Sequence, residues 1–222
     1  MFGFVSMNEL QTTLPVLKVK STILMPHAQL PIVMNEHDYQ SVATEAIENN
    51  VVAVVQPQPI FINADNRNEL KKSYKTGCAG RITDISPTGN CVTITIYGLC
   101  RFEIIKEIEP VMSGASRVVV SYEKYLVDME EQTAENQEFD KQRLLDALDG
   151  YFRRLEISPN WKEIKNTPGN ILVSALAMAC PFHPSEKQSL LETVDFKERT
   201  DMITRMIEIN SYDRYNTTST VN

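Results

Sequence analysis

The chain has 222 residues, 42% of them hydrophobic, and carries a net charge of −7 at pH 7. This length is enough to bury a substantial core, in one domain or in two smaller lobes. The excess of acidic side chains disfavours general affinity for nucleic acid or for anionic membranes.

The cysteines and the apolar segments predict a reduced, cytoplasmic protein. No Cys-x-x-Cys pair occurs, so we expect free, semi-buried thiols and no metal site. The first residues lack the positive region and long apolar core of a signal peptide. The longest apolar run, Ile171 to Pro181, is too short to span a bilayer. We therefore expect no membrane contact. The cysteines concerned are Cys78, Cys91, Cys100 and Cys180.

Strands dominate the first half of the chain, with one helix among them. Apolar and polar residues alternate imperfectly from Leu14 to Lys20, which predicts a strand. The prolines of Met25-Pro26-His27 and Leu30-Pro31 are expected to interrupt regular structure, because proline lacks an N–H donor. Apolar residues from Tyr39 to Ile47 follow helical spacing, and Asn35 is expected to cap this helix.

A continuous apolar run from Val51 to Val55 predicts a strand buried on both faces and central in its sheet. Residues 56–76 then form a connection that is long for a compact domain and contains two prolines. Connections of this length are often functional or mobile.

The segment from Cys78 to Tyr97 predicts a β-hairpin with a turn at Ser86 to Asn90. Gly98 follows it and predicts a bulge or a positive φ. With Arg101 to Ile108 and Arg117 to Tyr125, about six strands and one helix result, as in a partly closed barrel. The side chains predicted to lie in the core are Ile82, Val92, Ile94, Ile96 and Phe102.

The second half predicts helices. Residues 128–138 contain five acidic side chains and no basic one, which predicts a solvated linker or the entry to a helix rather than a cation site. Beyond it, apolar stripes predict several helices, of which Ile171 to Ala179 is expected to have no wetted long face. Ser158-Pro159, Thr167-Pro168, His183-Pro184 and Asp195 are the predicted helix starts, and the helix from His183-Pro184 is expected to run to Glu192. The apolar stripes are Leu144, Leu145, Leu148, Phe152 and Leu155 in one helix, and Met202, Ile203, Met206 and Ile207 in the last.

A search for catalytic motifs finds no phosphate-binding glycine loop, no dinucleotide fingerprint and no serine-hydrolase elbow. We therefore predict no catalytic residue and no cofactor. His27, His37 and His183 are widely separated and lie beside proline or at a helix start, which favours exposed or capping roles. Lys71, Lys72 and Lys75 beside Tyr74 form either a solvated loop or a small phosphate-binding cluster.

Several motifs in order resemble one known family. Leu14-Pro15-Val16-Leu17 precedes Ile23-Leu24-Met25-Pro26, and Gly77 to Ile82 reads Gly-x-x-Gly-Arg-Ile. Gly98 to Ile104 reads Gly-x-x-Arg-Phe-x-Ile, and Leu172 to Leu191 resembles the helical region of stand-alone bacterial members. Together these segments resemble the amino-terminal, substrate-binding domain of Lon-type ATP-dependent proteases.

The resemblance extends over roughly residues 14–209 and implies an α+β fold with a PUA-like, twisted, partly closed β-barrel lobe and an all-helical lobe. We expect the β-lobe at residues 1–127, the acidic linker at 128–138, the helical lobe at 139–210 and a disordered tail at 211–222. It also implies that the ATPase and peptidase domains of full proteases are missing, and that the chain is not an enzyme.

The function implied is recognition of unfolded or apolar polypeptide segments or of a partner protein, through an apolar groove or an exposed sheet edge. The alternative is a PUA-like module that binds RNA or a small ligand. A contiguous apolar patch would favour protein binding, and a basic cleft would favour RNA. The predicted contact residues are Met25, Pro26, His27, Pro57, Pro59, Ile60 and Phe61.

Overall fold

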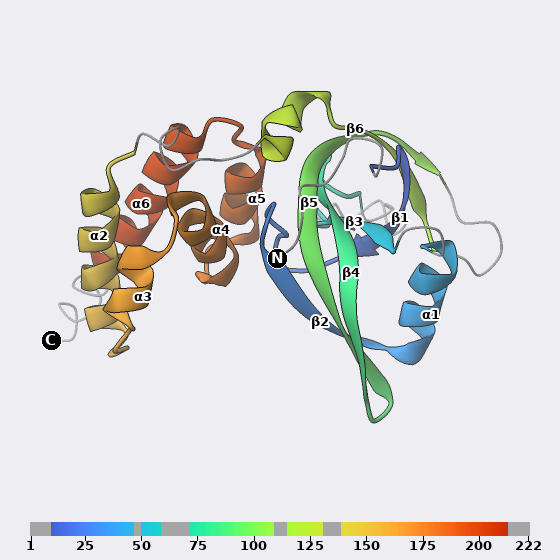
Figure 1. Cartoon of the computed structure of the whole chain (residues 1–222), viewed down its shortest axis with the longest axis horizontal. Coiled ribbons are helices and arrows are strands. Elements are labelled where there is room, and N and C mark those ends of the chain that lie inside the picture. The colour runs from blue at the N-terminus through green and yellow to red at the C-terminus, as the bar shows by residue number, and fades with distance from the viewer. Residues whose placement is uncertain (1–9, 47–49, 59–71, 109–114, 131–138, 213–222) are drawn as a thin grey trace, which may run out of the picture. The chain divides into compact units, whose positions relative to one another are not determined.

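The computed structural model describes residues 10–46, 50–58, 72–108, 115–130 and 139–212 (Figure 1). Its internal contacts divide the chain into two compact units. The first unit contains Met1–Glu131 together with His183–Glu192, and the second contains Gln132–Phe182 together with Thr193–Asn222. The predicted domain boundaries stay a prediction, and residues 183–192, predicted among the helices of the second half, group here with the strands.

The first unit contains a six-stranded sheet in the order β2-β5-β4-β3-β1-β6 (Figure 1). β5 also pairs with β6, so the sheet closes on itself into a barrel, while β2 pairs only with β5 at an edge. β1 and β3 are parallel, and the other pairs are antiparallel. The expected α+β fold with six strands is confirmed. The strands are β1 (Thr13–Lys18), β2 (Gln29–Asn35), β3 (Val51–Val55), β4 (Thr76–Thr88), β5 (Cys91–Ile108) and β6 (Arg117–Ser121).

Most of the predicted core of the barrel is confirmed by burial. All five residues of β3 are buried, between β4 on one side and β1 on the other. β5 alternates, with its apolar side chains inward and its threonines half-exposed, as a strand with one buried face does. The five side chains predicted for the core are all buried: Ile82, Val92, Ile94, Ile96 and Phe102.

The bulge predicted at Gly98 is confirmed, but its φ is not positive. β4 and β5 shift register where Gly80 pairs with Gly98 directly after Ala79 pairs with Cys100, so the residue between is extra. A Cβ on Gly98 would lie 2.1 Å from the carbonyl oxygen of Met25, so the close approach of two backbones requires glycine here.

Two predicted interruptions are wrong in detail. Pro31 lies inside β2, which accepts a proline because β2 is an edge strand with a neighbour on one side only. Ser86 to Thr88 belong to β4, and the hairpin turns at Gly89 and Asn90 alone. The φ of Gly89 is +62°, which a two-residue hairpin turn needs and glycine readily adopts.

In the described part of the first unit, three helical elements accompany the strands. Helix α1 (Glu36–Glu45) begins as predicted, because Oδ1 of its N-cap Asn35 accepts from the N–H of Asp38 at 2.8 Å. The 3-10 element η2 (Glu123–Met129) follows β6, and α5 (Pro184–Glu192) returns from the second half of the chain. Part of the expected α1, at residue 47, lies outside the described residues.

The second unit is helical, with α2 (Lys141–Arg154), α3 (Trp161–Asn166), α4 (Gly169–Ala179) and α6 (Phe196–Tyr212). The Asp195 cap is confirmed, since its Oδ1 accepts from the N–H of Glu198 at 2.7 Å. The starts predicted at Ser158-Pro159 and Thr167-Pro168 are displaced: Asn160 caps α3, and Pro168 directly precedes α4. Within the described residues, no helix is long and apolar enough to cross a membrane.

The buried faces of these helices differ in part from the predicted stripes. α2 buries Leu144, Leu148 and Tyr151, whereas Leu155 is exposed. α4 is not buried all round: Ile171, Ala175 and Ala179 form an exposed row at four-residue spacing, because the helix packs through its opposite face. α6 buries Ile203 and Ile207 as predicted, with half-exposed methionines beside them, and it extends to Tyr212, inside the predicted tail.

Candidate functional site

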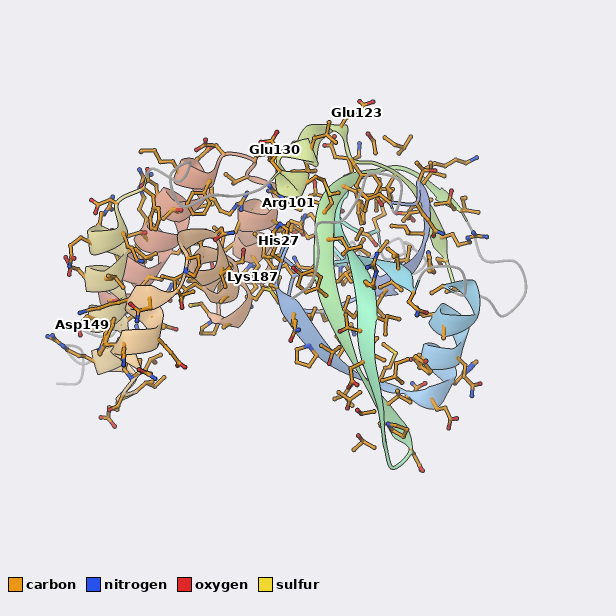
Figure 2. All side chains as sticks on the ribbon, in the orientation of Figure 1. His27, Arg101, Glu123, Glu130, Asp149 and Lys187 are labelled. Atoms are coloured by element: carbon orange, nitrogen blue, oxygen red, sulfur yellow. The ribbon has the colours of Figure 1, made fainter. Side chains whose placement is uncertain are left out.

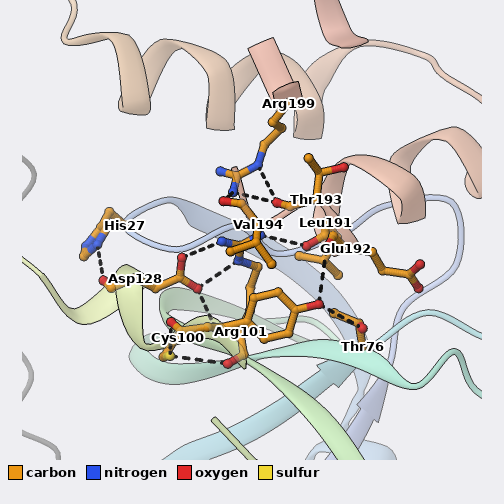
Figure 3. A network of polar contacts seen from close by, with 11 residues as sticks. His27, Thr76, Cys100, Arg101, Asp128, Leu191, Glu192, Thr193, Val194 and Arg199 are labelled. Atoms are coloured by element: carbon orange, nitrogen blue, oxygen red, sulfur yellow. Dashed lines mark hydrogen bonds and ion pairs between the residues drawn. The ribbon is translucent and has the colours of Figure 1, made fainter. Parts of the chain in front are cut away.

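The turn predicted as a contact surface is packed against β5. The Met25 side chain has no exposed surface, and Pro26 is also buried. The backbone N–H of His27, which Figure 2 labels, donates to the carbonyl of Gly98 at 2.9 Å. The His27 Nε2 lies 3.0 Å from the carbonyl oxygen of Asp128 (Figure 3). Met25 and Pro26 therefore offer almost no side-chain surface to a partner, because the turn packs against Gly98 of β5.

The second predicted contact segment is described only at its start. Pro57 is half-buried and forms an isolated antiparallel bridge with Ser73. Pro59, Ile60 and Phe61 lie outside the described residues, so their contact with a polypeptide stays a prediction.

An open cleft of about 430 Å³ lies beside that bridge, within the first unit. Residues 72–75 form one wall and residues 104–107 of β5 form another. The pairing of β4 with β5 begins at Thr76, and the last bond towards the cleft runs from the N–H of Ile104 to the carbonyl of Lys75 at 2.7 Å. The cleft thus occupies the place where the two segments cease to pair. Lys18, Gln58 and Ser116 complete its lining.

The backbone of Ser73 faces the cleft. The backbone groups of its two neighbours bond to residues 56–58, away from β5. The carbonyl of Lys72 accepts from the N–H of Gln58 at 2.8 Å, and the N–H of Tyr74 donates to the carbonyl of Gln56 at 2.9 Å. Because backbone groups alternate along an extended chain, those of Ser73 point the opposite way, as the carbonyl of Lys75 does. No bond to the N–H or C=O of Ser73 is found among the described residues.

The lining of the cleft is basic, although the whole chain is acidic. Of the described residues, four lysines and one carboxylate, Glu107, line it. Within the described part of the chain, the exposed side chains of Lys72, Lys75 and Lys106 form no ion pair. Ile105, 66% exposed, adds an apolar patch.

The sequence predicted one wall of this cleft. Of the predicted solvated loop or phosphate-binding cluster, Lys72, Tyr74 and Lys75 lie in that wall, and Lys71 lies outside the described residues. The prediction missed Lys18 and Lys106, which come from two strands that only the fold brings together. One pattern in the sequence could have indicated them: each lysine directly follows two apolar residues near the end of a strand, Lys18 after Leu17 and Lys106 after Ile105.

A buried ion pair between Arg101 and Asp128 lies just before the cleft residues of β5 (Figure 3). The guanidinium of Arg101 donates from Nε and Nη2 to the two carboxylate oxygens of Asp128, at 2.8 and 2.7 Å. Its Nη1 donates to the carbonyl of Leu191 in α5 at 3.0 Å, and it lies 4.5 Å from the centre of the Tyr125 ring. Both charged side chains are almost wholly buried.

The prediction that Asp128 begins a solvated linker is therefore wrong, because a buried guanidinium needs a counter-charge and Asp128 provides it. The remainder of that predicted linker, residues 131–138, lies outside the described residues. The network joins η2 and α5 to β5, and we interpret it as structural.

The groups around the ion pair are poorly suited to nucleophilic chemistry. Burial raises the pKa of the Cys78 thiol well above its usual value, and burial with the nearby Asp128 carboxylate raises the pKa of Cys100 to about 12. Thiolate is the reactive form, so both thiols are inert near neutral pH. Among the described residues, no group of three or more His, Cys, Asp or Glu side chains is arranged to hold a metal ion.

Comparison with known proteins identifies the family. Residues 13–208 match the model of the ATP-dependent protease La (LON) substrate-binding domain, and the chain belongs to this family. Among curated proteins, a Lon protease of Desulfosudis oleivorans is 25% identical over 217 residues, covering 90% of this chain and 24% of that protein. The chain thus spans about a quarter of that relative's length.

Solved structures of similar fold include the N-terminal domain of a Mycobacterium avium complex Lon protease. It has a TM-score of 0.57 at 18% identity, covering 91% of this chain and 99% of that one. A Lon N-terminal domain protein from Xanthomonas campestris has a TM-score of 0.56 at 16% identity, covering 88% of this chain and 98% of that one. At these identities the likeness concerns the fold.

Proposed function

We propose that this chain is a non-catalytic recognition module that binds polypeptide segments, either unfolded and apolar stretches or part of a partner protein. The observation that carries the proposal is membership of a substrate-binding domain family over residues 13–208, which include all six strands and nearly all of the helices. The substrates of a Lon protease are polypeptides, so binding of polypeptide is the property transferred.

The cleft of the first unit supports this proposal. It is open, its lining includes Gln58 next to Pro57, and it presents backbone groups that a bound segment can pair with. Its apolar component is small, with Ile104, Ile105 and Tyr74 among the lining residues. Such a site suits weak, transient contact, with a dissociation constant on the order of micromolar.

The non-enzymatic part of the proposal rests on the missing motifs and on the raised pKa values of the two buried thiols. Purified protein is expected neither to hydrolyse ATP nor to cleave casein. Turnover that co-purifies through several columns and disappears in a point variant would overturn this part.

RNA or another anion is the second candidate, because four lysines line the cleft. The net charge of −7 disfavours it, and so does the presence of one aromatic residue, Tyr74, among the described residues of the cleft, since single-stranded nucleic acid usually needs a longer basic surface with several aromatic side chains. We also expect the protein to act in the cytoplasm without membrane contact.

The test is a side-by-side titration of a labelled unfolded protein and a labelled RNA at low and moderate salt. Binding of the unfolded protein with modest dependence on salt supports the proposal. Tight RNA binding that falls steeply with salt, without polypeptide binding, would replace it by the second candidate.

A further inference from the structure

We propose that the cleft between residues 72–75 and residues 104–107 takes an acidic, extended polypeptide segment, which pairs with the backbone as an added strand. This inference rests on the proposed function and deepens it, because it names both the chemistry of the segment and the way it is held. Two independent features of the cleft support it: the charge of its lining and the direction of its backbone groups.

The charge of the cleft selects for carboxylates. Among the described residues, Lys18, Lys72, Lys75 and Lys106 line it, and Glu107 is the one carboxylate. The chain as a whole has 29 acidic and 22 basic side chains, so the cleft is a basic site on an acidic molecule. A basic concave site attracts anionic ligands and repels cationic ones. Aspartate and glutamate are the anionic groups that a polypeptide supplies.

The backbone of the cleft selects for an extended ligand. β4 and β5 pair as far as Thr76 and Glu103, and the bond from Ile104 to Lys75 continues that pairing by one step. Beyond it the cleft separates the segments, and the N–H and C=O of Ser73 point into it without a partner among the described residues. An extended peptide in this gap would satisfy these groups as a neighbouring strand does.

Polypeptide fits this combination better than nucleic acid does. Strand pairing uses donors and acceptors at the spacing of a peptide backbone, which nucleic acid lacks. Exposed Ile105 gives an apolar contact of the size of one side chain. The ligand we infer is therefore a short segment with several carboxylates and one or two apolar residues.

Three labelled peptides of about ten residues test the charge. They share their apolar residues and carry glutamate, glutamine or lysine at the remaining positions. We expect the full-length protein to bind the glutamate peptide most tightly and the lysine peptide least, with the difference decreasing as salt rises. Equal binding of the glutamate and glutamine peptides overturns the inference while leaving polypeptide recognition intact, whereas binding of none contradicts both.

Charge reversal locates the site. The double variant Lys72→Glu/Lys106→Glu is expected to bind the glutamate peptide roughly ten-fold more weakly at low salt, because each exposed ion pair contributes a small factor. The matched control, Lys162→Glu/Lys165→Glu, makes the same change of charge at two exposed lysines of α3 in the second unit and is expected to change affinity less than two-fold. Equal losses in both variants would show a nonspecific charge effect and reject this cleft.

Backbone methylation of the peptide tests strand pairing without altering the protein. Two versions of the glutamate peptide are N-methylated at alternate residues, one at the odd and one at the even positions. A paired strand bonds its neighbour through every second residue, so one version should bind much more weakly than the other. Equal affinities reject the added strand, and tighter binding of a uridine-rich RNA than of the glutamate peptide rejects polypeptide as the ligand.

Discussion

Two basic residues of β5, Arg101 and Lys106, lie in opposite environments: Arg101 is buried and Lys106 is exposed. At Arg101 the strand buries a guanidinium and satisfies it with a carboxylate, a carbonyl and an aromatic ring. Five residues later, Lys106 stands exposed at an open cleft with no ion pair among the described residues. Buried charge must be matched inside the protein, whereas exposed charge remains available for a ligand. Position in the fold, rather than the presence of a basic side chain, separates a structural role from a binding role.

Removing the buried carboxylate should have the largest effect on stability. Asp128→Ala leaves the Arg101 guanidinium buried without a counter-charge, which is expected to cost about 3–5 kcal/mol. Urea unfolding followed by circular dichroism measures it. The exposed Glu123→Ala in the same 3-10 element is the control, with almost no expected change.

The apolar double replacement Arg101→Met/Asp128→Leu removes both charges together, and it should recover much of the loss. If Asp128→Ala unfolds at the same urea concentration as the wild type, the charge pair is not structural.

An uncharged benchmark for burial comes from the same strand. Ile94→Ala removes a wholly buried side chain, and the loss of contacts and the cavity left behind are expected to cost about 2–5 kcal/mol. Ile105→Ala changes an exposed isoleucine of β5 and should alter the free energy of unfolding by less than about 0.5 kcal/mol. Equal denaturant midpoints for the two variants would contradict the assignment of buried and exposed faces.

The thiols beside the buried pair should be protected in a way that a half-exposed thiol is not. A disulfide reagent at pH 8 is expected to modify half-buried Cys91 in the native protein and to leave Cys78 and Cys100 unmodified until urea is added. Folding raises the pKa of both buried thiols, so the folded state keeps protons that the unfolded chain loses. The free energy of unfolding should therefore fall as pH rises from about 9 to about 12. Rapid native modification of all three thiols would contradict their burial.

The cleft should show the smallest effect on stability and a clear effect on binding. Lys106→Glu is expected to change the free energy of unfolding by less than about 0.5 kcal/mol, because the side chain is exposed. The same variant should weaken binding of an acidic peptide several-fold, which fluorescence anisotropy measures. A large loss of stability would mean that Lys106 is structural and would remove the contrast with Arg101.

Local patterns in the sequence predicted the elements better than the site. The β-branched run Val51–Val55 and the alternation of Ile94 with its neighbours depend only on near residues, so strands and core followed directly. The Arg101–Asp128 pair joins residues 27 apart through a turn of the chain, and neither residue type signals burial by itself. The cleft likewise combines Lys18 with Lys106, which no local pattern connects. The sequence predicts an exposed turn at Met25, because proline-containing turns usually lie at the surface. Its burial depends on Gly98, 73 residues away in the sequence, against which the turn packs.

The place of α5 along the chain limits how this protein can be dissected. The polypeptide leaves the first unit after Glu131, re-enters it for His183–Glu192 and then leaves again, so no single cleavage separates the two units. A fragment ending at Glu131 would lose the carbonyl acceptors that α5 gives to Arg101, Tyr125 and Gln56. A stable version of the barrel by itself would therefore have to include α5, joined to it by circular permutation or by a new linker.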